Sequence, residues 1–172
     1  GLSTTRSQVL LEILDNVAGR VEAWKPEGAN WTRREIKAPF PGTLGLQALH
    51  DPQVDNDALG ESYFLTYTDF VTPDSLYLGS TGSDGLDKLK SRPEFFNAAG
   101  MRVEQGFATS KDGTRVPYFV VWPAGAKADG KNPTVLYGYG GFEQSMQPWY
   151  SAGYGTGWFS KGGVLVVANI RG

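Results

Sequence analysis

The first eighty residues alternate between apolar and polar positions and are divided by turn residues at short intervals. Residues 20–25 follow a period of two, and residues 62–70 combine aromatic rings with threonines, which is typical of strands. Residues 8–14 are apolar enough for a helix or a strand, and the short distance to the next strand favours a hairpin. Further strands are predicted at residues 31–36, 43–49 and 75–79.

This succession of short strands predicts that residues 1–80 are all-β and hold the end of one β-propeller blade and most of the next. A blade repeat takes roughly 40–50 residues, so the region is too short to close a propeller. A piece of a β-sandwich would show the same alternation, and the pattern does not distinguish the two folds.

Residues 81–100 are richer in Gly, Pro and charge, and are predicted to be an interdomain linker. Residues 101–172 then predict a second domain, in which Asp112-Gly113 marks a hairpin between two extended runs. Residues 164–168 form a continuous apolar run, typical of a strand buried on both faces. Residues 147–161 are expected to contain a short helix. The order hairpin, strand, helix, strand is that of the N-terminal part of an α/β-hydrolase sheet.

The most distinctive stretch is residues 134–142, where an apolar strand, expected to be buried, ends in a glycine-rich turn. Its glycines allow the backbone to turn sharply, and the turn carries two large rings, Tyr139 and Phe142. The end of a strand in an open α/β sheet is a common ligand site. A tight turn whose rings pack into the core would have the same pattern, so both interpretations remain open.

Composition limits the chemistry. The 172 residues are 40% hydrophobic and 13% aromatic, which indicates a globular chain, and the net charge of −2 offers no electrostatic basis for binding nucleic acid. There is no cysteine and only one histidine, His50, so neither a metal nor a cofactor is expected. No apolar run has the length of a membrane-spanning helix, so no membrane contact is expected.

A serine hydrolase of this fold carries its nucleophile in a Gly-x-Ser-x-Gly turn, and no serine here lies in one. Residues 82–85 come closest, but their glycines are misplaced. A dinucleotide fingerprint fails because Glu143 stands where a third glycine is needed. His50 precedes Asp51, but neighbours on a strand point to opposite faces, so His50 is predicted to be a surface residue.

Three motifs together resemble the prolyl oligopeptidase family of serine peptidases. They are Tyr-Gly-Tyr-Gly-Gly-Phe at 137–142, Ala-Asn-Ile-Arg-Gly at 168–172 and Ser-Lys-Asp-Gly-Thr-Arg-Val-Pro at 110–117. In that family a β-propeller covers an α/β-hydrolase domain. The resemblance is closest over residues 101–172 and looser upstream. The Gly-Phe after Tyr-Gly-Tyr-Gly indicates the prolyl-specific branch over the related oligopeptidase B group.

The resemblance implies a role for each ring of the turn. Tyr139 matches the family tyrosine whose phenol donates a hydrogen bond to the oxyanion, and Phe142 matches the aromatic residue that lines the pocket for the substrate proline. Trp149 and Tyr150 have no matching role and are predicted to pack in the core. Arg171 is predicted to cap the sheet or to pair across the domain interface.

The family places its Ser, Asp and His beyond this stretch. The resemblance therefore implies an internal piece of an endopeptidase that cleaves short peptides on the carboxyl side of proline, inactive by itself. The expected partners are a short proline-containing peptide and the remainder of the parent polypeptide. The expected location is the cytoplasm, with the periplasm as the alternative. A second hypothesis is a non-catalytic binding module whose sheet edge after Ile170 needs a partner.

Overall fold

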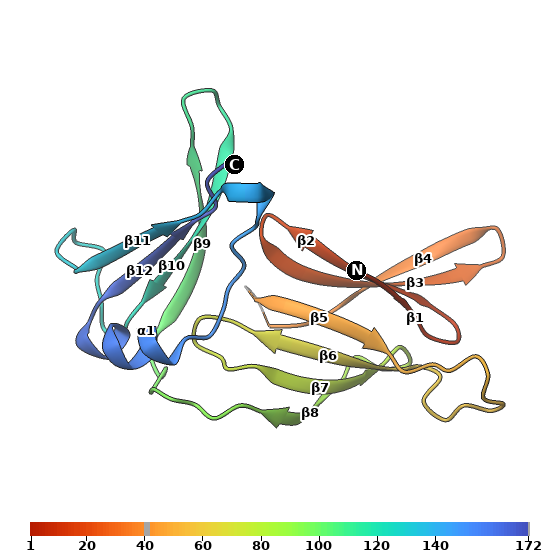
Figure 1. The fold of residues 1–172 in the computed structure, drawn as a ribbon. Coiled ribbons are helices and arrows are strands. Elements are labelled where there is room, and N and C mark those ends of the chain that lie inside the picture. The colour runs from red at the N-terminus through yellow and green to blue at the C-terminus, as the bar shows by residue number, and fades with distance from the viewer. Residues whose placement is uncertain (40–41, 172) are drawn as a thin grey trace. The chain divides into compact units, whose positions relative to one another are not determined.

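The computed structural model describes residues 1–39 and 42–171 and divides the chain into two compact units (Figure 1). The first unit comprises residues 1–68 and 74–92, and the second comprises residues 69–73 and 93 onward. Within the described residues the strands form three four-stranded sheets, two in the first unit and one in the second. The chain is therefore mostly β-sheet.

Both sheets of the first unit are antiparallel throughout, with consecutive strands paired as neighbours. The segment that could have been a helix is strand β2, which confirms the hairpin interpretation. One sheet consists of β1 (Leu2–Thr4), β2 (Val9–Asp15), β3 (Ala18–Glu27) and β4 (Asn30–Ile36). The other consists of β5 (Thr43–Ala48), β6 (Ser62–Thr68), β7 (Ser75–Ser80) and β8 (Leu86–Ser91).

The core of the first unit lies between its two sheets, and residues two apart on β3 and on β6 contribute to it. The predicted alternation is thereby confirmed, because residues two apart on a strand share one face. Burial in this core raises the pKa of the Tyr63 hydroxyl. The core side chains are Leu10, Val21, Ala23 and Ile36 from the first sheet and Leu44, Tyr63, Leu65 and Tyr67 from the second.

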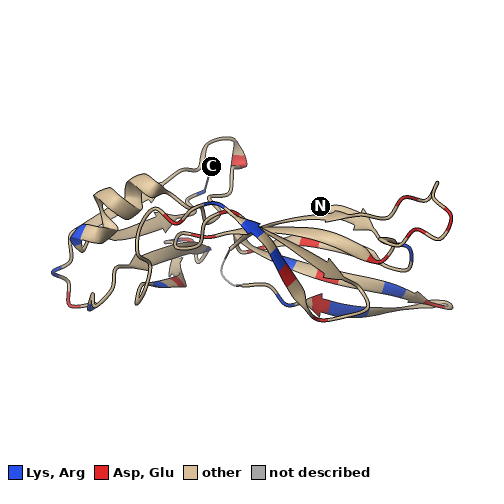
Figure 2. Cartoon of the chain, turned by 90° about the horizontal axis from the view of Figure 1, so that it is seen from below, with Lys and Arg blue, Asp and Glu red and all other residues tan. Residues whose placement is uncertain are grey.

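Strand β8 contradicts part of the predicted linker at residues 81–100. Residues 86–91 pair with β7 and complete the second sheet, and the first unit extends to Arg92. The strand has lysines at positions 88 and 90 because it lies at the sheet edge, where charged side chains reach solvent and discourage pairing with other chains. Figure 2 shows acidic and basic residues interspersed along several strands of the chain.

The second unit contains a mixed sheet of order β11-β12-β10-β9 (Figure 1). Strands β9 (Arg102–Thr109) and β10 (Arg115–Trp122) form the predicted hairpin, and Gly113 in its turn has φ +83°. Strands β11 (Thr134–Gly138) and β12 (Val164–Ala168) run parallel. The connection between them holds the short helices η1 (Gly141–Glu143), α1 (Ala152–Gly157) and η2 (Phe159–Lys161). A hairpin followed by a strand, a helix and a parallel strand was expected, and this order is confirmed.

Aromatic rings form the core of the second unit on the side of the sheet where α1 lies. Phe70 is buried, with its ring centroid 5.6 Å from that of Phe119 and 5.2 Å from that of Trp149. Tyr150 stacks on Phe96 at 5.1 Å. The prediction that Trp149 and Tyr150 are packing residues is confirmed by these contacts.

Strand β11 was expected to be buried, and the structure contradicts this. Its Leu136 side chain is 72% exposed, and Tyr137 is also exposed. The reason is that β11 is an edge strand in the described chain, with a neighbour on one side only. No helix in the described part of the chain is long and apolar enough to cross a membrane.

Candidate functional site

The residues that follow β11, Tyr139 to Glu143, form a turn that we call the aromatic turn. β11 ends at Gly138, which is paired with Ala168 of β12. Phe142 then has φ 56° and ψ 29°, and Glu143 has φ 54°. Two consecutive residues with side chains thus adopt the left-handed region, at a cost of about 1–2 kcal/mol each. Such strain is concentrated at functional sites, where the surrounding structure maintains it.

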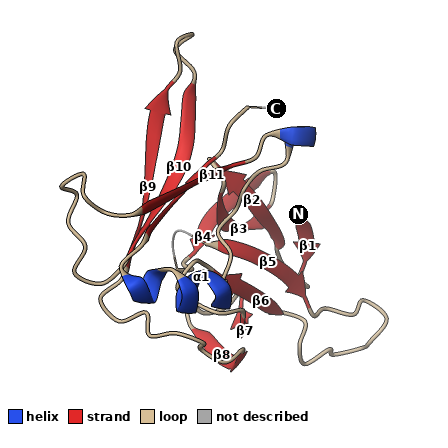
Figure 3. Cartoon of the chain, turned by 60° about the vertical axis from the view of Figure 1, so that its left-hand side comes forward, coloured by secondary structure: helices blue, strands red, loops and turns tan. Residues whose placement is uncertain are grey.

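Two glycines shape the aromatic turn for different reasons. A Cβ added at Gly140 would lie 2.6 Å from the carbonyl oxygen of Arg171, so the glycine allows two backbone segments to touch. A Cβ added at Gly141 would lie 2.7 Å from the hydroxyl oxygen of Tyr139. The phenol therefore lies directly over Gly141. Figures 1 and 3 show η1 beside the C-terminal end of the described chain.

The two rings of the aromatic turn are presented to solvent. Phe142 is 97% exposed and Tyr139 is 37% exposed, so the alternative of a core turn is wrong for Phe142 and incomplete for Tyr139. In the part of the chain that the structure describes, the Tyr139 hydroxyl makes no hydrogen bond. An unused phenol donor and an apolar ring together can stabilise negative charge and bind an apolar group.

Asn169, which the sequence interpretation missed, binds the segment that leaves the aromatic turn. Its Oδ1 accepts a hydrogen bond of 2.7 Å from the Met146 amide, and its Nδ2 donates one of 3.3 Å to the Met146 carbonyl. The backbone amide of Asn169 donates to the carbonyl of Pro117 at 3.0 Å. The only signal in the sequence was an amide side chain directly after a buried strand.

Arg171 fixes the tip of the β9–β10 hairpin. Its guanidinium forms an ion pair with Asp112 and donates to Ser110 Oγ at 3.1 Å. The Arg171 hydrogen bond, followed by that from the Thr114 amide, holds the pKa of the Asp112 carboxyl well below its usual range. The prediction of a structural role is confirmed, but these partners lie within the second unit. Two motifs that identified the family therefore meet in space.

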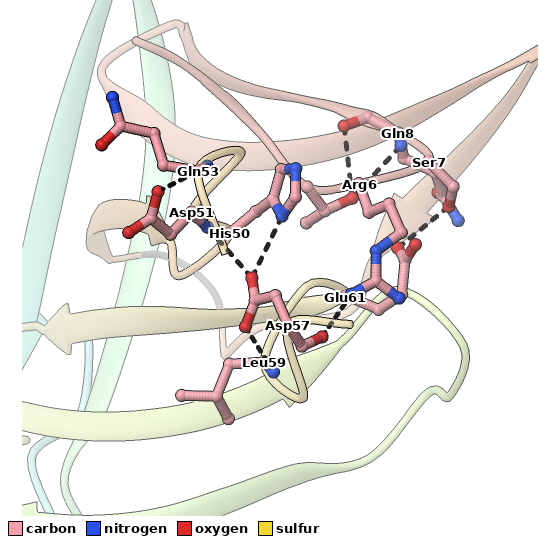
Figure 4. Close-up of polar contacts among 10 residues, drawn as sticks. Arg6, Ser7, Gln8, His50, Asp51, Gln53, Asp57, Leu59 and Glu61 are labelled. Carbon is pink, nitrogen blue, oxygen red and sulfur yellow. Dashed lines mark hydrogen bonds and ion pairs between the residues drawn. The ribbon is translucent and has the colours of Figure 1, made fainter. Parts of the chain in front are cut away.

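His50 belongs to a polar cluster in the first unit (Figure 4). Its side chain is 19% exposed, and its Nδ1 lies 3.1 Å from Asp57 Oδ2, so the residue predicted to lie at the surface is partly buried. The backbone amide of Asp51, then that of Leu59 and the His50 ring, lower the pKa of Asp57. Arg6 donates to the Asp57 carbonyl. The loop is ordered by these contacts, and His50 has a role within them.

The aromatic turn itself contains no histidine, and His50 is occupied in the first unit. Within residues 1–39 and 42–171, no group of three or more His, Asp or Glu side chains is arranged to hold a metal ion. The two rings of the turn can therefore orient and polarise a ligand.

No family model matches the chain. The chain is 39% identical over its whole length to an uncharacterized peptidase of Sinorhizobium fredii, of which it covers 23%. It is 37% identical, over 81% of its length, to a prolyl endopeptidase of Elizabethkingia miricola, of which it covers 19%.

Solved structures of similar proteins also match the chain. A post-proline cleaving enzyme from Rickettsia typhi matches 99% of the chain at 32% identity, with a TM-score of 0.69. A structure from a study of two prolyl endopeptidases matches all of it at 31% identity, with a TM-score of 0.79. Each match spans 24% of the known structure.

These relatives are peptidases, and the sequence and fold of the chain place it in that class of protein. More narrowly, the chain belongs to the prolyl oligopeptidase family, as its motifs predicted. It spans less than a quarter of the length of the curated relatives it matches.

Proposed function

We propose that the chain is part of a serine endopeptidase that hydrolyses short peptides on the carboxyl side of proline. The observation that carries this proposal is the match of 99% of the chain, at 32% identity, to a post-proline cleaving enzyme. The exposed aromatic turn supports it, because a strained, solvent-facing ring after a parallel strand is suited to binding a ligand. The nucleophile, base and orienting acid are proposed to lie in the parent polypeptide, so the 172 residues alone are expected to be inactive.

The domain assignment follows from the same proposal. The sheets β1–β4 and β5–β8 would be neighbouring blades of a β-propeller, since both are antiparallel and share one core. The sheet β9–β12 would be the N-terminal part of an α/β-hydrolase domain, since it combines a hairpin with a parallel pair joined through α1. The linker would then begin after Arg92, where the first unit ends.

Tyr139 is assigned to the oxyanion. When a nucleophile attacks the carbonyl carbon after proline, the carbonyl oxygen becomes negatively charged, and a donor already aimed at it lowers the barrier. The Tyr139 hydroxyl suits this role, because in the described chain it is partly exposed and has no hydrogen-bond acceptor. The bond would form chiefly in the transition state, so its loss should reduce kcat.

Phe142 is assigned to the pocket that receives the substrate proline. The pyrrolidine ring of a proline within a peptide is apolar and has no N–H, so it gains most from an aromatic wall. The Phe142 ring is nearly fully exposed and therefore available for such a contact.

The test is cleavage of a chromogenic peptide with a single proline before the reporter group, by the complete natural polypeptide that contains this chain. Tyr139→Phe should lower kcat by about 10²–10³. Tyr150→Phe is the matched control, because it also loses one hydroxyl, whose contact is the Phe95 amide at 2.8 Å. It should leave kcat unchanged. Equal kcat for Tyr139→Phe and the unaltered enzyme would refute the oxyanion role.

The alternative is a non-catalytic binding module, favoured by the exposed edge strand β11. It predicts that the complete polypeptide binds a partner but cleaves no proline-containing peptide. We propose a cytoplasmic location, with the periplasm as the alternative, and fractionation of the source cells would test it.

A further inference from the structure

The aromatic turn lies between two anchors. On one side Gly138 is paired with Ala168 in the sheet. On the other side Met146 is bound by the side chain of Asn169. Between these anchors the Gln144 amide donates a hydrogen bond of 3.2 Å to the Gly141 carbonyl. The segment therefore depends for its shape on its two ends and on the close contact of Gly140 with the Arg171 backbone.

The contact between Asn169 and Met146 resembles a short piece of sheet. A side-chain amide offers a donor and an acceptor, as a peptide group does, and Asn169 uses both on one residue. After Met146 the next packed residues are the buried Pro148 and Trp149. Without Asn169 the second anchor would move to them, and the unsupported loop would lengthen.

Asn169 can act as an anchor because it is itself fixed. Its amide is bound to the Pro117 carbonyl of β10, and it follows directly on β12. Two residues later, Arg171 is bound to the hairpin tip through Asp112 and Ser110. The segment from Asn169 to Arg171, which supports the turn, is thus fixed at both of its ends.

From this geometry we infer that Asn169 is a positioning residue, which keeps Tyr139 and Phe142 in their exposed arrangement through its two hydrogen bonds to Met146. The strained left-handed conformation of Phe142 and Glu143 needs such support, because without it the backbone would relax. The effect on catalysis rests on the proposed peptidase function, and the effect on the turn does not.

The first experiment measures amide hydrogen exchange of residues 139–146 in the complete polypeptide. Asn169→Ala should speed exchange at Met146 and Gln144 by on the order of tenfold, because both side-chain hydrogen bonds to Met146 are lost and the loop lengthens. Asn132→Ala is the control, because it also removes a bond from a side-chain amide to a carbonyl, that of Lys127 at 2.5 Å. It should leave exchange at 139–146 unchanged. Unchanged exchange in Asn169→Ala would overturn the inference.

The second experiment asks whether Asn169 acts through Tyr139. Asn169→Ala should lower kcat by about tenfold to a hundredfold, since a displacement near 1 Å can cost 10²-fold. In a Tyr139→Phe background, with the donor already lost, the same change should lower kcat by less than about threefold. If Asn169→Ala lowers kcat by the same factor in both backgrounds, Asn169 does not act through Tyr139 and has a structural role only. KM should rise too, as Phe142 is displaced.

The two proposals fail separately. If the unaltered polypeptide shows no cleavage after proline, the proposed function is wrong, and hydrogen exchange still decides whether Asn169 holds the turn. If cleavage is present and exchange of residues 139–146 does not change in Asn169→Ala, the positioning role is wrong while the peptidase assignment stands.

Discussion

Gly141→Ala is the sharpest available perturbation of the proposed oxyanion donor. The new Cβ would lie 2.7 Å from the Tyr139 hydroxyl oxygen and 3.0 Å from the ring carbon that bears it. Ordinary contact begins at 3.4 Å, so the hydroxyl must move by about 0.7 Å. Gly141 does not have a positive φ, so alanine adds no backbone strain there.

The magnitude follows from that displacement. A misplacement of about 1 Å costs on the order of 10²-fold in rate, and complete loss of a donor costs about 10²–10³. Gly141→Ala should therefore lower kcat by about tenfold to a hundredfold, less than Tyr139→Phe. The melting temperature should change little, because the displaced group is the partly exposed end of a side chain.

Gly140→Ala is the matched control for this variant. Its Cβ would meet backbone, 2.6 Å from the Arg171 oxygen and 2.9 Å from the Arg171 carbonyl carbon. Backbone atoms move aside less readily than the end of a side chain, so the free energy of unfolding of this variant should be lower by roughly 1–3 kcal/mol. Steady-state kinetics and thermal melts on both variants decide the matter. Full kcat in Gly141→Ala, or a loss of rate that only follows a loss of folded protein, would refute the oxyanion role of Tyr139.

Two further predictions concern neighbouring residues. Phe142→Ala should leave the melting temperature unchanged, because the ring is almost fully exposed, while KM for the proline peptide rises; a lower melting temperature with unchanged KM would show a packing role. Asp112→Asn should alter the acid dependence of stability. The folded-state pKa of Asp112 is lowered, chiefly by Arg171. The contribution of Asp112 to the stability of the fold is therefore fully present above the ordinary pKa of about 3.9 and is lost as the pH falls from there through the folded-state pKa. Denaturant unfolding at several pH values measures the free energy of unfolding, which should fall less steeply below about pH 4 in the variant than in the unaltered protein. An identical fall in both proteins would contradict the prediction.

The sequence alone determined the features that depend on neighbouring residues. The alternation in residues 62–70 predicted β6, and Asp112-Gly113 predicted the β9–β10 turn, because strand period and turn chemistry are local properties. The motif at residues 137–142 was specific enough to identify the family. Locally encoded elements of this kind accounted for most of the observed strands.

Edges and exposure were decided by the tertiary structure. The lysines of β8 concealed a strand within a predicted linker, and apolar β11 proved to be exposed. Whether a strand lies at an edge depends on which partner pairs with it, and composition carries that information only weakly.

The supports of the aromatic turn were also decided in three dimensions. Asn169 binds Met146, 23 residues away, and Arg171 binds Asp112, 59 residues away. No local pattern selects among the many polar residues that could pair over such separations. Only the alignment of β12 with β10 and β11 brings Asn169 and Arg171 to the turn and the hairpin tip, because the register of the sheet fixes where the chain emerges after Ala168.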